Sequence, residues 1–311
     1  MEAAIRVAHE GGFVAAELRA RNNLASVVWD REPRRAAALE WEAYELSRRL
    51  GDRSHANWAL NNSVGSRWYA GRDWDEAVAE MSEAIAAVRG GTDEGRLAST
   101  LALITVARGE PTDETMGLLE LHASQVSDPS AQAAIHFLRG ERAWLAGDHQ
   151  TAAIEIYEAS RQEGMRTIYL PLAIRPALWH GDVARVRAMA SELDAMPESE
   201  QPVTMANRAI AWADVAALEG RPAAALDGYR DGWRRYRDIG YDFEFARSVV
   251  DALHVLGPDD PELGRAANEA REIFERVRAT PYLRLLDEAL ASAPGRARTA
   301  LTPSESVEAA R

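Results

Sequence analysis

Apolar residues recur along this chain at intervals of three and four, and short breaks of Gly, Pro, Asp or Asn interrupt the pattern about every dozen residues or more. In one such window, Ala77, Met81, Ala84, Ile85 and Val88 fall on one face of a helix. The alternation of apolar and polar residues that is typical of strands is nearly absent. Because the helical windows come in pairs between breaks, the sequence predicts an all-α chain of antiparallel helix pairs.

The breaks are also self-similar. An Asn-Asn pair precedes Trp29 and Trp68 at the same spacing, with a period of 39 residues (61 minus 22). A second unit begins with a glycine turn and continues into a helix that carries an early alanine; it occurs at Gly71, Gly147 and Gly220. Periodicity on this scale predicts stacked helical repeats.

Small residues stand where the two helices of a repeat would cross, and a large residue adjoins them. One set consists of Val64, Gly65, Trp68, Ala77, Met81 and Ala84, and another of Ala213, Ala216, Ala225, Tyr229 and Gly232. In this pattern the chain resembles the tetratricopeptide-repeat (TPR) family. The resemblance implies a TPR-like right-handed superhelix, an α-solenoid of antiparallel helix pairs, over residues 1–291.

A narrower resemblance rests on residues 268–291 and on the runs E-L-R-A-R-N-N-L-A from Glu17 and R-L-G-D-R from Arg49. These segments are similar to the C-terminal repeat region of two groups of large bacterial proteins. One group is the class III adenylate/guanylate cyclases with an ATPase module, and the other is the ATP-binding LuxR-type regulators. The resemblance implies a role in signalling or transcription regulation, with a cyclase, an ATPase or another regulatory domain as partner.

The two ends each leave an alternative open. Residues 2–10 read either as a short capping helix or as the second half of a helix pair from a longer chain. Residues 292–311 form a linker and a short tail in which Thr302, Pro303 and Glu305 make a helix-start signal. That tail is similar to the opening of a LuxR-type helix-turn-helix domain; the alternative is a disordered tail.

Composition excludes several classes of function. The chain has no cysteine and, by inspection, no lysine, so thiolate chemistry, Schiff bases and a P-loop lysine are all excluded. A net charge of -13 disfavours nucleic-acid binding by this chain. No apolar run approaches the roughly 20 residues of a membrane span, and the first ten residues do not predict a secretory signal, so we expect no membrane association and a cytoplasmic location.

No motif predicts catalysis. The seven histidines show no metal-binding spacing, and the chain lacks a G-x-S-x-G elbow. We therefore expect a non-catalytic protein that uses no cofactor and no metal.

In the TPR family the first helix of each pair lines the concave groove. Carried over by repeat position, the groove residues are Asn22, Asn62, Ser66, Tyr69, Glu141, Trp144, Asn207 and Asp214. Amides and an aromatic ring suit a peptide backbone or a small polar ligand. The resemblance therefore implies a module for protein–protein or interdomain recognition.

A sensor that binds a small-molecule inducer in the groove is the alternative. An enclosed pocket would favour the sensor, and an open groove would favour the module. A homodimer is a partner arrangement that the sequence leaves open.

Overall fold

The computed structural model describes residues 1–89, 93–197 and 200–291, and within these ranges it contains sixteen helices and no strand. The predicted all-α class is therefore confirmed. The predicted linker and tail, residues 292–311, lie outside the described residues. The helices are α1 (Glu2–Glu10), α2 (Val14–Val28), α3 (Pro33–Leu50), α4 (Arg53–Ala70), α5 (Trp74–Ala87), α6 (Glu94–Arg108), α7 (Asp113–Gln125), α8 (Pro129–Leu145), α9 (His149–Arg161), α10 (Arg166–His180), α11 (Val183–Asp194), α12 (Pro202–Leu218), α13 (Pro222–Ile239), α14 (Asp242–Leu256), α15 (Pro261–Val277) and α16 (Thr280–Ala291).

The predicted breaks are helix ends with defined caps. The carboxylates of Asp52, Asp148 and Asp182 accept backbone N–H groups in the first turns of α4, α9 and α11. Gly51 and Gly181 end α3 and α10 with positive φ angles of 71° and 78°, which a residue with a Cβ rarely adopts. Gly-Asp at a break thus ends one helix and starts the next.

Consecutive helices pack against each other along the chain. The pair α12–α13 shows why its crossing requires small residues. A Cβ added at Gly232 would lie 2.4 Å from Ile210, and one added at Gly228 would lie 2.9 Å from the Cβ of Ala213. Glycine therefore lets these two helices approach closely.

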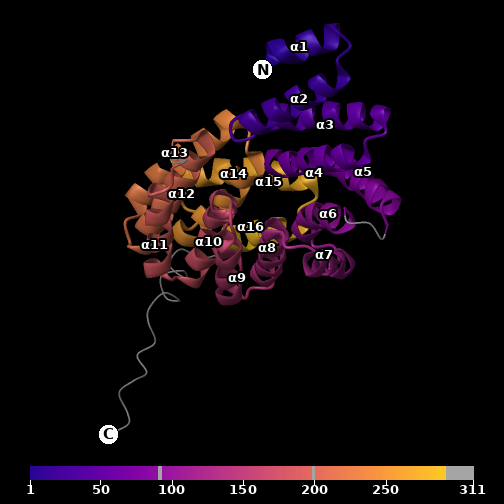
Figure 1. Ribbon diagram of the computed structural model, residues 1–311. Coiled ribbons are helices and arrows are strands. Elements are labelled where there is room, and N and C mark those ends of the chain that lie inside the picture. The colour runs from indigo at the N-terminus through magenta and orange to yellow at the C-terminus, as the bar shows by residue number, and fades with distance from the viewer. Residues whose placement is uncertain (90–92, 198–199, 292–311) are drawn as a thin grey trace.

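The helices form two layers. Among the even-numbered helices, α4 contacts α6, α6 contacts α8, α10 contacts α12, and α12 contacts α14. We call these even-numbered helices the inner layer, and the odd-numbered helices that join them the outer layer. Figure 1 shows the stack bending so that its C-terminal helices return toward its N-terminal ones.

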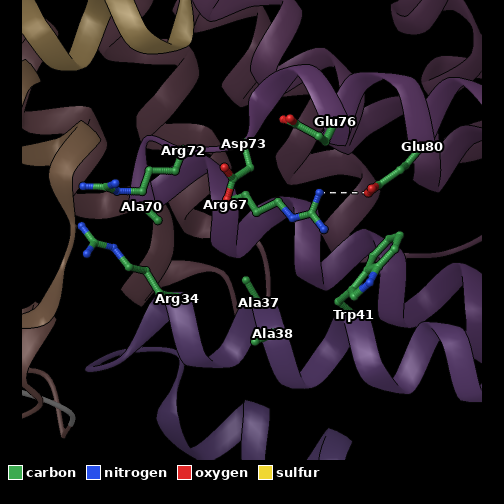
Figure 2. Close-up of a pocket in the computed structure, with 10 residues that line it drawn as sticks. All are labelled: Arg34, Ala37, Ala38, Trp41, Arg67, Ala70, Arg72, Asp73, Glu76 and Glu80. Carbon is green, nitrogen blue, oxygen red and sulfur yellow. Dashed lines mark hydrogen bonds and ion pairs between the residues drawn. The ribbon is translucent and has the colours of Figure 1, made fainter.

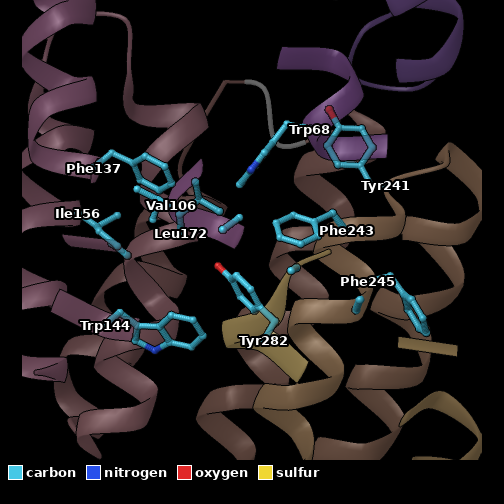
Figure 3. Packing of buried hydrophobic residues seen from close by; sticks show 14 of the residues in the cluster. Trp68, Val106, Phe137, Trp144, Ile156, Leu172, Tyr241, Phe243, Phe245 and Tyr282 are labelled. Atoms are coloured by element: carbon cyan, nitrogen blue, oxygen red, sulfur yellow. The ribbon is translucent and has the colours of Figure 1, made fainter. Parts of the chain in front are cut away.

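The return of the chain closes the inner layer on itself. Helix α14 contacts α4, and α16 contacts α6. The Phe243 ring lies 5.2 Å from Trp68 of α4 and 5.3 Å from Tyr282 of α16, measured between ring centroids (Figure 3). Every residue of α14 from Phe243 to Leu253 is buried, so this helix fills the space that a superhelix would leave as a groove.

Polar contacts hold the same junction. Arg108 Nε donates to the carbonyl of Val277 (3.0 Å), and Arg276 Nε donates to the carbonyl of Gly71 (3.1 Å). Both acceptors lie at helix ends, where carbonyl groups lack partners within the helix. The N-terminal and C-terminal thirds of the described chain are thus joined directly.

Candidate functional site

All eight predicted groove residues lie on inner-layer helices, namely α2, α4, α8 and α12. The structure places them in two environments. Tyr69, Glu141, Trp144, Asn207 and Asp214 contact the C-terminal helices α13, α14 or α16 or their connections, as described below. Asn22, Asn62 and Ser66 lie outside that region.

Glu141 belongs to a buried ion-pair network. Arg247 of α14 is fully buried and donates to Glu141 (2.7 Å) and to Glu244 (3.0 Å). The Tyr282 hydroxyl of α16 donates to the other oxygen of Glu141 (2.9 Å). Burial alone would lower the pKa of Arg247, but the carboxylates of Glu141 and Glu244 raise it well above its ordinary value. Glu141 therefore binds two helices of this same chain.

A second buried arginine extends the network. Arg175 Nε donates to Asp251 (2.8 Å), and its Nη2 lies 3.5 Å from Glu244. The indole N–H of Trp179 donates to the second oxygen of Asp251 (2.8 Å). Burial raises the pKa of Asp251, and Arg175 opposes this effect. Helices α8, α10 and α14 thus share one set of interior charges, and α16 adds the Tyr282 hydroxyl to it.

The two predicted residues of α12 bind outer-layer tyrosines. Asp214 accepts a hydrogen bond of 2.5 Å from the Tyr229 hydroxyl, and Asn207 accepts one of 2.6 Å from the Tyr236 hydroxyl. Burial, and secondarily the charge of Asp251, raise the pKa of Asp214 well above its usual value. The buried site of Asp214 therefore favours its neutral form more than water does.

Trp144 and Tyr69 make ring contacts in the same region. The Trp144 ring lies 5.5 Å from both Trp179 and Tyr282, and the Tyr69 ring lies 5.0 Å from Tyr241 (Figure 3 shows Trp144, Tyr282 and Tyr241). Aromatic pairs at these distances add to the stability of a core. Both predicted residues thus contribute to closing the inner layer.

Little space remains inside this region. Two adjoining cavities of about 20 Å³ each share Pro171, Leu172, Asn207 and Glu244 in their walls. Arg175 Nη1 is buried and has no hydrogen-bond partner among the described residues. A cavity of this size holds about one water molecule, and a water there would satisfy such a donor. Neither cavity has room for an organic substrate.

The C-terminal half of the network was not predicted from the sequence. Arg247, Ser248 and Asp251 follow Glu244 by three, four and seven residues in the otherwise apolar run of α14. They form a polar stripe on one face of the helix, and all four side chains are buried. A polar stripe inside an apolar helix is the signal that could have identified them.

Asn22 lies in a different setting. A cleft of about 500 Å³, which we call the N-terminal cleft, opens between α2, the start of α4 and α6, and its walls include Arg19, Asn22, Asn23, His55, Trp58 and Arg96. The Asn22 Oδ1 atom is buried and lacks a hydrogen-bond partner in the described part of the chain. Arg19 is exposed and forms no ion pair with any described residue. An open cleft thus lies beside α2 and the start of α4.

The two remaining predicted residues do not line this cleft. Asn62 is partly exposed on α4. The Ser66 hydroxyl lies 3.5 Å from Glu40, a buried residue of α3. Burial raises the pKa of Glu40 to about 8, against a smaller lowering by Ser66. Ser66 thus donates a hydrogen bond to a carboxyl group of the outer layer.

A second cleft lies on the outer layer. It has a volume of about 460 Å³ between α3, the end of α4 and α5, and we call it the α3–α5 cleft (Figure 2). Arg67 bridges its wall: its guanidinium lies 5.1 Å from the Trp41 ring and 2.9 Å from Glu80. Burial raises the pKa of Glu80 in spite of this ion pair.

Among the described residues, no group of three or more His, Asp or Glu side chains is arranged to hold a metal ion. In the same ranges, none of the helices combines the length and apolar character that a membrane span requires. No protein-family model matches this chain, and no curated protein matches it.

Proposed function

We propose that this chain is a TPR-like right-handed superhelix of antiparallel helix pairs, and that it works as a non-catalytic module for protein–protein or interdomain recognition in a bacterial signalling or transcription-regulating system. Its partner is an extended peptide segment with a carboxylate, bound in the N-terminal cleft. The observation that carries this proposal is the contrast within the inner layer. Its C-terminal part is filled by α14 and α16, whereas the part between α2 and α4 is open and lined by amides.

The chemistry of the N-terminal cleft supports a peptide. Asn22 and Asn23 line the cleft, and the exposed amide of Asn23 can both donate to and accept from a peptide backbone. Arg19 and Arg96 supply positive charge for a carboxylate, although Asp93 pairs with Arg96. The partly buried ring of Trp58 offers an apolar surface for a side chain.

A sensor that encloses an inducer in the concave groove has less support. The interior cavities hold about one water molecule each, and the predicted groove residues there already bind side chains of α13, α14 and α16. An inducer would have to displace those helices.

The test is an array of short peptides followed by fluorescence anisotropy. We expect peptides with a free carboxylate to bind, and their amidated or neutral counterparts to bind more weakly. The substitutions Arg19→Ala and Asn22→Ala should each weaken binding about 5- to 10-fold, since each removes one polar contact. Arg161→Ala, which removes an exposed arginine of α9, is the matched control. Equal binding by Arg19→Ala and the wild type would contradict this site.

A further inference from the structure

Three arginines from distant parts of the chain share one carboxylate oxygen. Arg34 at the start of α3, Arg72 after α4 and Arg276 near the end of α15 all donate to Oδ2 of Asp242, at 2.8, 3.4 and 3.3 Å. Asp242 is the first residue of α14. We call this group the arginine cluster.

The arginine cluster has more positive charge and more donors than its carboxylate can satisfy. Each guanidinium offers five N–H groups. Arg34 and Arg72 each use one nitrogen on Asp242, and the buried Nε of Arg72 has no hydrogen-bond partner among the described residues. Burial lowers the pKa of Arg276, and the positive charges of Arg72 and Arg34 lower it further. The carboxylates of Asp242 and Glu272 act in the opposite direction but do not cancel this lowering. Positive charge is therefore in excess here.

The arginine cluster borders an open space. Arg34 and Arg72 also line the α3–α5 cleft, and Figure 2 shows their guanidinium groups together at one end of it. Trp41 and the Arg67–Glu80 pair lie at the other end. Between them the alanines Ala37, Ala38 and Ala70 leave the floor free of bulky side chains. The volume of about 460 Å³ lies within the range of small-molecule sites.

The opposite wall carries acids. Glu76 and Glu80 lie on the side of the cleft away from the arginine cluster, whereas Asp73 directly follows Arg72 and lies between Arg72 and Arg67 (Figure 2). Asp73 precedes α5 with a φ of +56°, a conformation that is uncommon for a residue with a side chain, and its carboxylate makes no capping bond. A second anionic group on a ligand would be repelled by these acids. A hydroxyl or ammonium group would be bound by them.

We propose that the α3–α5 cleft binds a small phosphate monoester whose remaining part is neutral or cationic. The phosphate lies between Arg34 and Arg72, where guanidinium groups can bind its oxygens in pairs. It replaces or supplements Asp242 as the acceptor, and the N-terminus of α14 adds favourable positive potential. The organic part lies over the alanine floor toward Trp41. This site is separate from the N-terminal cleft and does not depend on the peptide proposal.

Calorimetric titration of the whole chain tests this site, with thermal unfolding as a second readout. The probes are inorganic phosphate and phosphoethanolamine, with ethanolamine and sodium chloride at matched ionic strength as controls. We expect saturable binding of both phosphate compounds, tighter for phosphoethanolamine. No binding beyond the chloride control would overturn the proposal.

Three substitutions locate the site. Arg72→Gln should weaken phosphoethanolamine binding at least 10-fold, and Arg34→Gln is a second variant at a more exposed position. Asp242→Asn should tighten binding, because it removes the carboxylate that competes for the same donors; a purely structural role of Asp242 would not produce this gain. Arg139→Gln, in an exposed ion pair of α8, is the control. Wild-type affinity in both Arg72→Gln and Arg34→Gln would contradict the assignment.

Discussion

The two ends of the inner layer are made of the same kind of helix pair and differ in what covers them. Around Arg247 the inner helices are buried beneath α14 and α16, and ion pairs and aromatic rings join them. Around Asn22 the inner face is open. Within α1 only Ala8 is buried, and Phe13, which precedes α2, is 63% exposed. Repeat sequence alone therefore does not determine whether an inner face becomes a core or a cleft, since the returning C-terminal helices decide this.

The largest expected difference between the two regions is in the free energy of local opening. Backbone amides of α14 should exchange with solvent only through global unfolding, whereas those of α1 and α2 should open locally. We expect the two sets of opening free energies to differ by about 5 kcal/mol or more, given the stability of typical domains. Hydrogen exchange followed by mass spectrometry measures both in one sample. Similar protection of α1 and α14 would contradict the contrast between an open N-terminal region and a closed C-terminal region.

A substitution in the closed region tests its charge network. Arg247→Met leaves Glu141 and Glu244 buried without their main cation, which should cost about 3–5 kcal/mol of unfolding free energy. Denaturant unfolding measures the loss. Arg161→Met, which removes an exposed arginine in an i,i+3 pair, should change stability by less than about 1 kcal/mol. A loss at Arg247 as small as that of this control would show that the network is dispensable.

Acid should weaken the closed region through His254. Its ring stacks on Trp179 with 4.0 Å between centroids, and burial lowers its pKa to about 4. A histidine with a lowered folded pKa contributes stability above its unfolded pKa of about 6.5, and this contribution is lost as the pH falls toward 4. His254→Gln should remove about 1–3 kcal/mol of that acid-dependent loss. Unfolding curves from pH 7 to pH 4 provide the measurement.

Glu40 should have the opposite pH dependence in the N-terminal region. Its raised pKa of about 8 means that the folded state holds a proton which the unfolded state releases near pH 4.5. The contribution of Glu40 to the free energy of unfolding is therefore fully present below about pH 4.5 and is lost as the pH rises to about 8. Glu40→Gln should be more stable than the wild type at pH 8 by about 1–3 kcal/mol, and near equal at pH 4. A gain that does not depend on pH would contradict this explanation.

The smallest effect should come from the exposed end. Phe13→Ser replaces a ring that is 63% exposed, so thermal stability should change by no more than about 0.5 kcal/mol. A larger loss would show that α1 and α2 are as tightly packed as the closed region.

Helical content was predictable because it depends on local signals. Apolar spacing marks each helix, and pairs such as Gly51-Asp52 and Gly181-Asp182 mark where one ends and the next begins. The predicted crossing residue Gly232 does lie where α12 and α13 approach closely.

The closure of the inner layer could not be read in the same way. Phe243 meets Trp68 across 175 residues (243 minus 68), and no local pattern encodes that partner. Glu141 and Asp214 were predicted as groove residues from their repeat positions, whereas their binding of Arg247 and Tyr229 depends on how tightly the chain bends. Whether Asn22 binds a ligand stays a prediction.

The contact of α14 with α4 also has a consequence for the order of events during synthesis. Arrays of stacked repeats generally fold through contacts between neighbours, so each unit can settle soon after it leaves the ribosome. Here the indole of Trp68 meets its Phe243 partner only after nearly all of the described chain has been made. Such high-separation contacts slow folding and leave apolar surface unprotected in the meantime. The packing of α4 in the nascent chain is therefore completed only after α14 has been synthesised.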